Sequence, residues 1–391
     1  MSHLMNTYAR LPVAFTHGEG VWLYDDAGKR YLDALSGIAV NTLGHNHPGL
    51  VKAIADQAAR VLHTSNLYGI PLQERLADRI AEASGMDEVF FCNSGCEANE
   101  AAIKLARMYG HQKGIDLPHV IVMENAFHGR TLATLSATGN RKAQAGFEPL
   151  VQGFIRVPYR DIEAIRKIGE HNHGVAAVML EMIQGEGGVN VADETFQREL
   201  RALCDEKGWL LICDEVQCGM GRTGKWFGWQ HAGAKPDVMT LAKGLASGVP
   251  IGACVTAGKA KGLFGPGNHG STFGGNPLAC AAGLATFDAI VGDRLMENAV
   301  TVGEAIRKGI AEALEGVAGV VDVRGRGLMI GIELDRPCGE LMARAAEQGL
   351  LLSITSERVV RLLPALTFTA ADAQTLVSML APMIRDFLAQ G

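Results

Sequence analysis

Short runs of apolar residues alternate with amphipathic segments between about Glu88 and Ala257. Seven such runs stand out: VFFC (89–92), VIVM (120–123), FIRV (154–157), AAVML (176–180), WLLIC (209–213), DVMTLA (237–242) and GACVTA (252–257). Most are apolar at every position, as strands covered on both faces must be. Segments with helical spacing, such as 97–109 and 194–207, lie between them. This order predicts an α/β domain with a largely parallel sheet.

The two ends of the chain have a different pattern. Near the start, VWLYDDAGKRYLD (21–33) is typical of a hairpin with its turn at Ala27–Gly28. The C-terminal part predicts two long helices over 277–291 and 294–315 and two strands over 320–323 and 328–334. A further helix, two short strands and a closing helix that ends near Ala389 are expected to follow. We therefore expect a large domain over 46–283 and a small α+β domain built from 1–45 and 284–391.

Composition excludes several classes of protein. The chain has 391 residues, 48% hydrophobic and 20% charged, with a formal net charge of −6. These values exclude a disordered chain and argue against a broadly nucleic-acid-binding surface. No apolar run approaches the ~18 residues of a membrane-spanning helix, and the first residues lack a secretory apolar region. Glycine is in excess, at 48 of 391 residues or about 12%, against an ordinary ~7%.

The eight cysteines predict neither a disulfide framework nor a metal site. They form no C-x-x-C pair and no zinc-ribbon spacing, and the histidines form no H-E-x-x-H motif. Several cysteines lie in apolar runs, where a reduced thiol packs as a small hydrophobe. A reducing, cytoplasmic compartment is therefore expected.

The first glycine cluster, Asn93–Cys96, lies between a predicted strand and a helix that begins near Glu97. A strand, a turn of small residues and a helix N-terminus form an anion site, because free N–H groups and the helix dipole point outward. An ordinary turn between a strand and a helix explains the same residues equally well. The tetrapeptide alone leaves both interpretations open.

Asp214 and Glu215 follow the most apolar run, and ligands of open α/β sheets bind at the carboxyl ends of strands. A carboxylate there can pair with a buried cationic group of a ligand, although helix capping is an alternative for either acid. The segment 219–224 has the form G-x-G-x-x-G. It is separated from the strand, and the following KWFGWQ is a poor crossover helix, which favours a glycine-rich loop over a dinucleotide site.

Lys243 follows the run DVMTLA directly and precedes the small residues of 244–248. A lysine at a strand end is normally a solvated surface group. Burial and nearby cations, however, lower a lysine's pKa and yield the neutral amine that Schiff-base chemistry needs. An anion cradle, an acid and such a lysine together match the requirements of pyridoxal 5′-phosphate: a phosphate site, a partner for the pyridinium nitrogen and a Schiff-base amine.

Nearly end to end, the sequence resembles the class-III pyridoxal-phosphate-dependent aminotransferases, and within them the subgroup that acts on ω-amino groups. The matching segments are SGIAVNTLGHNHP (36–48), FFCNSGCEANEAAIKLAR (90–107), AFHGRTLATLSATG (126–139), QGEGGV (184–189), DEVQCGMGRTG (214–224), LAKGLASGVPIGA (241–253) and STFGGNPLA (271–279). The resemblance implies the type-I fold of these transferases, with a mostly parallel seven-stranded sheet between helices and a small domain from both termini. It also implies a homodimer with shared active sites.

By this resemblance, Lys243 holds the cofactor as a Schiff base and moves the proton between Cα and C4′, while Asp214 keeps the pyridine nitrogen protonated. The other implied cofactor contacts are Val216 and Phe127 on the two ring faces, Gln217 near the 3′-oxygen, Glu215 in the same segment, the Gly95 and Cys96 amides on the phosphate, and Thr272 reaching that phosphate from the other chain.

The resemblance also implies arginine clamps for substrate carboxylates, which suit arginine's forked geometry. Arg130, aided by Ser271 of the other chain, is expected to bind the α-carboxylate of N2-acetylornithine. Arg361 is expected to bind the α-carboxylate of glutamate. Glu186 is expected to act as a switch that pairs with Arg361 and releases it when glutamate enters.

The implied reaction transfers the δ-amino group of N2-acetylornithine to 2-oxoglutarate, a step of arginine biosynthesis. Succinylornithine and succinyldiaminopimelate remain alternative substrates. Free ornithine and 4-aminobutyrate are less favoured, and Ile38 stands where ornithine enzymes tend to have an aromatic residue. No nucleic-acid or membrane partner is expected.

Two rival interpretations belong to other classes of protein. A non-catalytic binding protein of the same fold is disfavoured because Lys243, Asp214 and Arg361 are all present, and a nicotinamide oxidoreductase rests only on the 219–224 motif. The chain departs from the family pattern at Met182, where a proline is common, and at Cys96, where a smaller residue is usual. Thiols at helix N-termini are often reactive, so we expect Cys96 to react faster when the cofactor is absent.

Overall fold

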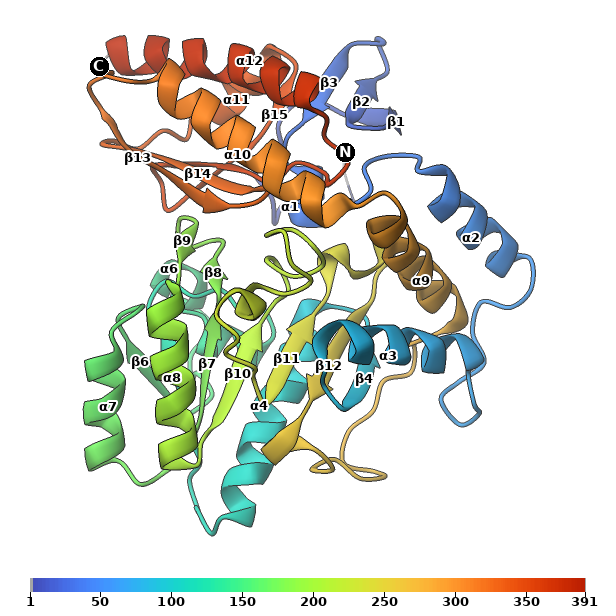
Figure 1. The fold of residues 1–391 in the computed structure, drawn as a ribbon, viewed down its shortest axis with the longest axis vertical. Helices are drawn as coiled ribbons and strands as arrows, with labels where there is room; N and C mark the ends of the chain where they lie inside the picture. Colours follow the sequence, from blue (N-terminus) through green and yellow to red (C-terminus); the bar gives the residue numbers. More distant parts are fainter. Residues whose placement is uncertain (1–2, 391) are drawn as a thin grey trace.

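A seven-stranded sheet forms the centre of the computed structural model, which describes residues 3–390 (Figure 1). Its strand order is β4-β12-β11-β10-β7-β5-β6. The strands are β4 (Glu88–Cys92), β5 (His119–Met123), β6 (Phe154–Val157), β7 (Val175–Glu181), β10 (Leu210–Asp214), β11 (Val238–Leu241) and β12 (Gly252–Thr256). All seven predicted strands are confirmed. The sheet is mixed because β12 runs antiparallel to both of its neighbours, β11 and β4.

Helices cover both faces of this sheet, which explains why its strands are apolar throughout. They include α3 (Pro71–Ser84), α4 (Gly95–Gln112), α7 (Ile162–His171) and α8 (Glu194–Lys207). Successive strand residues point to opposite faces. Leu210 packs in a cluster with Leu105 of α4, whereas Leu211 packs in the cluster that contains Leu200 of α8. Each strand therefore buries both sets of its side chains.

The helix after β4 begins earlier than the sequence predicts. The Ser94 side chain accepts a hydrogen bond from the backbone N–H of Glu97 at 3.2 Å and so caps the helix at Gly95. Gly95 and Cys96 consequently lie in the first turn of α4, where backbone N–H groups have no helical partner.

The two ends of the chain combine in two smaller four-stranded sheets, ordered β1-β2-β3-β15 and β13-β14-β17-β16. Their strands are β1 (Phe15–Glu19), β2 (Trp22–Asp25), β3 (Arg30–Asp33), β13 (Val320–Arg326), β14 (Met329–Leu334), β15 (Leu350–Leu351), β16 (Ser353–Thr355) and β17 (Val359–Leu362). The predicted hairpin is the β2–β3 pair. Strand β15 pairs with β3, with Leu350 opposite Leu32, so the first and last parts of the chain share one sheet (Figure 1).

Helices connect and cover these sheets. The C-terminal ones are α9 (Pro277–Gly292), α10 (Leu295–Ala313), α11 (Leu341–Glu347) and α12 (Ala370–Ala389). The boundary expected at 283/284 falls inside the continuous helix α9, and residues 1–2 and 391 of the expected domains lie outside the described residues. Within residues 3–390, no helix combines the length and apolar character that crossing a membrane requires.

The remaining elements are short or lie near the N-terminus. They are α1 (Ser36–Ala39), α2 (Pro48–Ala58), α5 (Leu132–Ala137), α6 (Arg141–Gln144), β8 (Ile183–Gln184), β9 (Asn190–Val191) and the 3-10 helices η1 (Gly228–His231), η2 (Lys243–Ala246) and η3 (Gly258–Ala260). The α1 turn is left-handed, with φ between +46° and +68° from Ser36 to Ala39. This conformation is strained for the β-branched Ile38.

Candidate active site

A cavity of about 310 Å³ lies at the carboxyl ends of the parallel strands. The loops that follow β4, β5, β10 and β11 line it, because the carboxyl ends of parallel strands meet at one edge of a sheet. The predicted site residues that these loops bring together are Gly95, Cys96, Phe127, Asp214, Val216, Gln217 and Lys243. Gly95 and Lys243, which are 148 positions apart in the sequence, thus line the same cavity.

Asp214, at the end of β10, is buried and held by a network of donors. Its Oδ2 accepts from Asn99 Nδ2 at 2.8 Å and lies 2.8 Å from His128 Nδ1. Its Oδ1 accepts from the backbone N–H of Val216 at 3.0 Å. Asn99 is fixed in turn by Thr240, whose hydroxyl donates to Asn99 Oδ1 at 2.7 Å. The carboxylate therefore has a defined orientation before any ligand is bound.

His128 is the most unusual group of the cavity. Burial alone lowers its pKa, but the hydrogen bond and charge of Asp214, with the charge of Glu181, raise the pKa of His128 above its ordinary value. The imidazole lines the cavity, and its Nε2 is buried without a hydrogen-bond partner among the described residues. The imidazole thus carries positive charge to higher pH than a free histidine and supports the negative charge of Asp214.

Glu181, the last residue of β7, fixes two neighbouring loops. Its carboxylate accepts from the backbone N–H of Phe127 at 3.0 Å and from that of Gly185 at 3.2 Å. Burial raises the pKa of Glu181, with a further contribution from the charge of Asp214 and an opposing one from His128. This buried acid joins the loop that presents the Phe127 ring to the loop that carries Glu186.

The first turn of α4 offers free hydrogen-bond donors to the cavity. The backbone N–H groups of Gly95 and Cys96 form no recorded hydrogen bond within residues 3–390. A Cβ at Gly95 would lie 2.9 Å from Cγ1 of Val216, a distance that real side chains do not tolerate. The close approach of Val216 therefore requires glycine at position 95. The free amides at the N-terminus of this 18-residue helix favour the binding of an anion.

Lys243 starts the 3-10 helix after β11 and projects into the same cavity. Its φ of +42° lies in the left-handed region, a strained conformation for a side chain of this size. Burial and, next, the charge of Arg361 lower the pKa of Lys243, although Glu186 and Asp214 oppose this shift. Within residues 3–390, Lys243 Nζ forms no hydrogen bond and no ion pair. The structure therefore supplies an amine that is easily deprotonated.

Arg361 and Glu186 form an ion pair beside the cavity. Arg361, on β17, is only 2% exposed, and its Nη1 lies 2.6 Å from Glu186 Oε1 and 3.2 Å from Gln217 Oε1. Its Nε donates to Ser353 Oγ at 3.1 Å. The Glu186 side chain is 38% exposed, so this partner, unlike the arginine, can leave toward solvent.

The backbone of Glu186 is held more firmly than its side chain. Its carbonyl oxygen accepts from the hydroxyl of Thr355 and, at 3.2 Å, from that of Ser356. Both donors lie at the end of β16, next to the strand of Arg361. The carboxylate can therefore rotate away from Arg361 while the loop stays in place.

Three further predicted residues lie outside the cavity lining. Arg130 is exposed, with its guanidinium 5.6 Å from the centre of the Phe127 ring. Ser271 and Thr272 lie in a separate hollow next to Asn93, whose side-chain amide donates to Ser271 Oγ at 3.2 Å. In a single chain, these two hydroxyl groups therefore do not reach the cavity.

Glu215, which the resemblance places among the cofactor contacts, is not among the residues that line the cavity. Its carboxylate accepts from the backbone N–H groups of Gly228 at 2.9 Å and Trp229 at 3.0 Å, and from the Cys218 thiol at 3.1 Å. Asp214, the last residue of β10, lines the cavity, whereas the next residue, Glu215, anchors the 228–231 turn. Burial raises the pKa of Glu215 to about 7.

The sequence did not single out Asn99, His128 or Glu181. A usable signal was present for His128, which stands beside Phe127 at the same edge of the sheet as Asp214. Asn99 and Glu181 gave no such signal, because one lies within a helix and the other ends an apolar strand.

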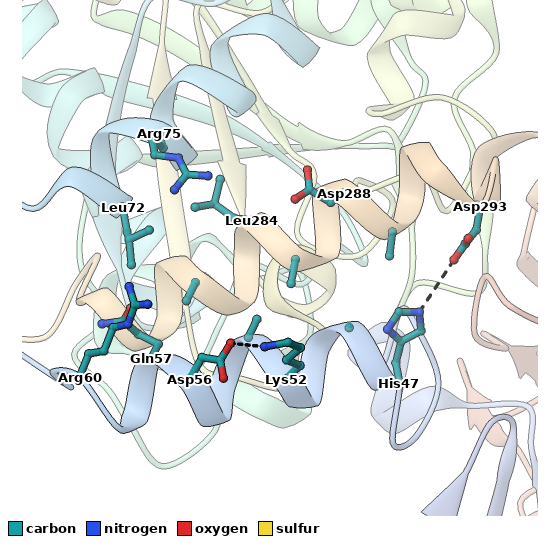
Figure 2. Close-up of a pocket in the computed structure, with 15 residues that line it drawn as sticks. His47, Lys52, Asp56, Gln57, Arg60, Leu72, Arg75, Leu284, Asp288 and Asp293 are labelled. Carbon is teal, nitrogen blue, oxygen red and sulfur yellow. Dashed lines mark hydrogen bonds and ion pairs between the residues drawn. The ribbon is translucent and has the colours of Figure 1, made fainter.

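A second, larger groove of about 550 Å³ lies between α2, α3 and α9 (Figure 2). Two pairs of its charged side chains interact across the groove lining, Lys52 with Asp56 at 2.6 Å and His47 with Asp293 at 3.8 Å. It contains none of the predicted site residues. Across residues 3–390, no group of three or more His, Cys, Asp or Glu side chains is arranged to hold a metal ion.

Residues 4–384 match the sequence profile of the family described as aminotransferase class-III. The fold and the lysine-containing cavity agree with this match, and the chain belongs to the class-III aminotransferases. Among similar proteins, the acetylornithine aminotransferase of Nitrosomonas europaea is 60% identical over 388 residues, 99% of each chain. The acetylornithine aminotransferase 1 of Bordetella bronchiseptica is 61% identical over all of this chain and 99% of its own. The resemblance inferred from the sequence is confirmed.

Solved structures agree with this assignment. The ornithine aminotransferase of Toxoplasma gondii ME49 superimposes with a TM-score of 0.95 at 32% identity, covering 100% of this chain and 94% of its own. The acetylornithine aminotransferase of Elizabethkingia anophelis gives a TM-score of 0.87 at 35% identity, over 98% and 96% of the two chains. The implied type-I fold is therefore confirmed.

Membership of this family implies pyridoxal 5′-phosphate as cofactor. A second structure of the Toxoplasma gondii enzyme, 33% identical with a TM-score of 0.94, is described with this cofactor at partial occupancy in its active site. The cavity here fits such a group. It offers free amides at the start of α4, an oriented Asp214 and an unpartnered Lys243 Nζ.

Proposed function

We propose that this chain transfers the δ-amino group of N2-acetyl-L-ornithine to 2-oxoglutarate, giving N-acetyl-L-glutamate 5-semialdehyde and L-glutamate. The observation that carries the proposal is the buried Arg361 with its releasable partner Glu186, next to Lys243. Support comes from relatives about 60% identical over the full chain, which are named acetylornithine aminotransferases. The reaction would belong to arginine biosynthesis.

Six residues of the cavity would hold the cofactor. Lys243 would bind it covalently through Nζ, and Asp214 would pair with its ring nitrogen. The others would contact the ring and the phosphate: Val216 and Phe127 on the ring faces, and the Gly95 and Cys96 amides on the phosphate. Pyridoxal phosphate supplies an electron sink that stabilises negative charge on the substrate carbon.

Lys243 would act as the acid and base of the reaction. Because burial and Arg361 lower its pKa, the freed amine is neutral at a lower pH than an exposed lysine. A neutral amine could take a proton from the substrate carbon and deliver it to C4′ of the cofactor. Asp214, supported by His128, would hold a proton on the ring nitrogen during this transfer.

Arg361 and Glu186 would let one cavity accept two different amino donors. While they are paired, the charge of Arg361 is neutralised, so an acylated diamino acid can enter with its ω-amine toward Lys243. When glutamate enters, Glu186 would turn toward solvent and leave Arg361 to bind the α-carboxylate. Arg130, at the exposed side of Phe127, would bind the α-carboxylate of the acylated substrate.

A second copy of the chain would complete the site. Ser271 and Thr272 do not reach their own cavity, and their loop is bound to the 61–68 segment through Asn66, which donates to Ser271 O at 3.0 Å. These two segments expose the large apolar side chains Leu62, Leu67, Tyr68 and Phe273. A clustered apolar surface of this kind is typical of an interface. We therefore propose a homodimer in which Ser271 and Thr272 serve the partner's cavity.

The test is a comparison of amino donors for the purified holoenzyme. We expect the highest kcat/KM with N2-acetylornithine among acetylornithine, succinylornithine, free ornithine and 4-aminobutyrate, with 2-oxoglutarate as acceptor. A K243A variant is the inactive control. Borohydride reduction followed by peptide mass spectrometry should place the cofactor on the peptide that contains Lys243. A highest kcat/KM on free ornithine would refute the proposed substrate.

Free ornithine is the second candidate because a structure with a TM-score of 0.95 is an ornithine aminotransferase. That protein is only 32% identical to this chain, against about 60% for the acetylornithine enzymes. Shared overall shape does not choose a substrate, since one fold supports many specificities. Sequence identity therefore favours the acylated substrate.

A further inference from the structure

A buried arginine connects the loop after β10 to the strand that carries Arg361. Arg222 lies in the glycine-rich segment 219–224, five residues after Gln217, and is 2% exposed. Its Nη1 donates to the carbonyl oxygens of Leu328 at 2.9 Å and Pro364 at 2.7 Å. The backbone joins the same elements, since Leu328 N–H donates to Arg222 O at 2.9 Å.

Both acceptors of Arg222 lie close to Arg361 in the β13-β14-β17-β16 sheet. Leu328 directly precedes β14, which pairs with β17 so that Gly331 lies opposite Arg361. Pro364 follows Arg361 by three residues. One guanidinium is therefore bonded to the start of β14 and to the end of β17. Its own loop leads back to Gln217, which contacts Arg361 at 3.2 Å.

The Arg222 guanidinium is only partly satisfied by its hydrogen bonds. The second terminal nitrogen, Nη2, is buried without a partner among the described residues, and both acceptors of Nη1 are neutral carbonyl groups. Burial lowers the pKa of Arg222 to about 10. Burying a charge without a counter-ion has a desolvation cost that hydrogen bonds to neutral carbonyl groups offset only in part. Arg222 thus makes its two carbonyl bonds while burying a charge that has no counter-ion, which favours a positioning role for the side chain.

The surrounding backbone is packed too closely to slide. A Cβ at Gly327 would lie 2.4 Å from Arg222 O, and a Cβ at Gly303 of α10 would lie 2.1 Å from Gly327 O. Around Arg222, three segments approach so closely that only glycine fits at their contacts. These segments are the 219–224 loop, the turn before β14, and α10. Strand β17 is held on both sides by β14 and β16, and the bond from Arg222 to Pro364 adds a direct tie between the end of this strand and the 219–224 loop.

We infer that Arg222 is a positioning residue that sets the place of Arg361 relative to Gln217, and thereby the affinity for dicarboxylate substrates. This inference rests on the proposed function, in which Arg361 binds the α-carboxylate of glutamate and 2-oxoglutarate. Acylated ornithine does not use Arg361 in that scheme. Loss of Arg222 should therefore weaken the half-reaction with glutamate and 2-oxoglutarate and leave the half-reaction with acetylornithine unchanged.

The test uses full-length holoenzyme carrying R222M, with the two half-reactions followed separately through the absorbance of the bound cofactor. We expect the KM for glutamate and for 2-oxoglutarate to rise by about tenfold or more, because small displacements of a clamping group are costly. The KM for acetylornithine and the kcat values should stay within about threefold. R222K should restore much of the dicarboxylate affinity, because its ammonium can donate to both carbonyls.

R201M is the matched control. Arg201 is also a largely buried arginine that bonds across elements, to Asp237 at 2.8 Å, but it lies at the opposite ends of the strands. R201M should leave the ratio of the two KM values unchanged. Equal KM increases for both amino donors in R222M, or an unchanged dicarboxylate KM in folded R222M, would overturn the inference.

A further variant separates this inference from the proposed function. If R361K leaves the dicarboxylate KM unchanged, the role proposed for Arg361 fails. If R361K raises that KM and R222M does not, only the inference about Arg222 fails. If R222M does not fold, R222Q, which keeps one donor, replaces it. We expect R222Q to raise the dicarboxylate KM in the same direction, and an unchanged value would overturn the inference.

Discussion

His128 Nδ1 lies 2.8 Å from Asp214 Oδ2, and both side chains are buried at the edge of the large sheet. The pair gives the carboxylate a positively charged neighbour on the side opposite its Val216 contact. The acid expected to face the cofactor is therefore supported by a second ionisable group. The state of that group depends on pH.

His128→Leu should reduce kcat by about tenfold to a hundredfold, because a hydrogen bond to a charged group contributes ~1.5–3 kcal/mol. His128→Gln, which keeps a donor, should recover part of this loss.

The raised pKa of His128 also predicts a pH effect on stability. The stabilisation of wild type over H128L should be complete below a pH of about 6.5 and should disappear as pH rises through the raised pKa. Urea denaturation at several pH values measures it, and a difference that does not change with pH would contradict the assignment.

Glu186→Gln should slow the half-reaction with acetylornithine by about tenfold to a hundredfold, because it leaves the charge of Arg361 unpaired in the cavity. The free guanidinium would then capture the α-carboxylate and orient the substrate wrongly. The half-reaction with glutamate should change by less than about threefold, since Glu186 is displaced there in any case. Single-turnover absorbance measurements of the two half-reactions provide the comparison.

Arg361→Lys is the reciprocal control for that prediction. It should impair the glutamate half-reaction and largely spare the acetylornithine half-reaction. Parallel losses in both half-reactions for both variants would show that the ion pair has no part in discriminating the two substrates.

Glu215→Gln should leave the affinity for pyridoxal phosphate within about threefold of wild type, because the Glu215 carboxylate binds the 228–231 turn and not the cavity. It should change the pH dependence of stability. A folded pKa of about 7, against about 4.5 when unfolded, means that wild type loses stability as pH rises from about 4.5 to about 7. The contribution of Glu215 to this loss should be on the order of 3 kcal/mol, so E215Q should lose about that much less stability than wild type over the same pH range.

The exposed Glu312→Gln provides a control for that experiment, because Glu312 lies on the surface of α10 and makes only a distant pair with Lys308. Its stability should follow the pH dependence of wild type. If E215Q follows wild type as well, the buried carboxyl is not the group that titrates.

Cys96 should be the one thiol that reacts readily in the native protein. All eight cysteines are free, and the other seven are buried. Cys96 lines the cavity, so bound pyridoxal phosphate should slow its reaction with a thiol reagent by about tenfold. Cys96→Ser should remove the fast reaction and retain cofactor binding, because the backbone amide is unchanged. Equal labelling of Cys96 with and without the cofactor would contradict this expectation.

Sequence patterns predicted most of the fold because its central strands are buried on both faces. The run WLLIC and its six counterparts have the continuous apolar pattern of strands in a covered sheet, and all seven are strands in the structure. The sequence pattern did not predict two features of the fold. The antiparallel direction of β12 has no sequence signature, and the Ser94 cap moved the start of α4 back to Gly95.

The sequence by itself determined the chemical types present: a lysine after one strand, an aspartate after another, a glycine turn before a helix, and two arginines suited to carboxylates. Only the tertiary structure decided which of these meet. It brought His128 and Asn99 to Asp214, paired Glu186 with Arg361, and turned Glu215 away. The physical reason is that strand and helix patterns depend on local periodicity. Burial, charge pairing and pKa depend on neighbours that are distant in the chain.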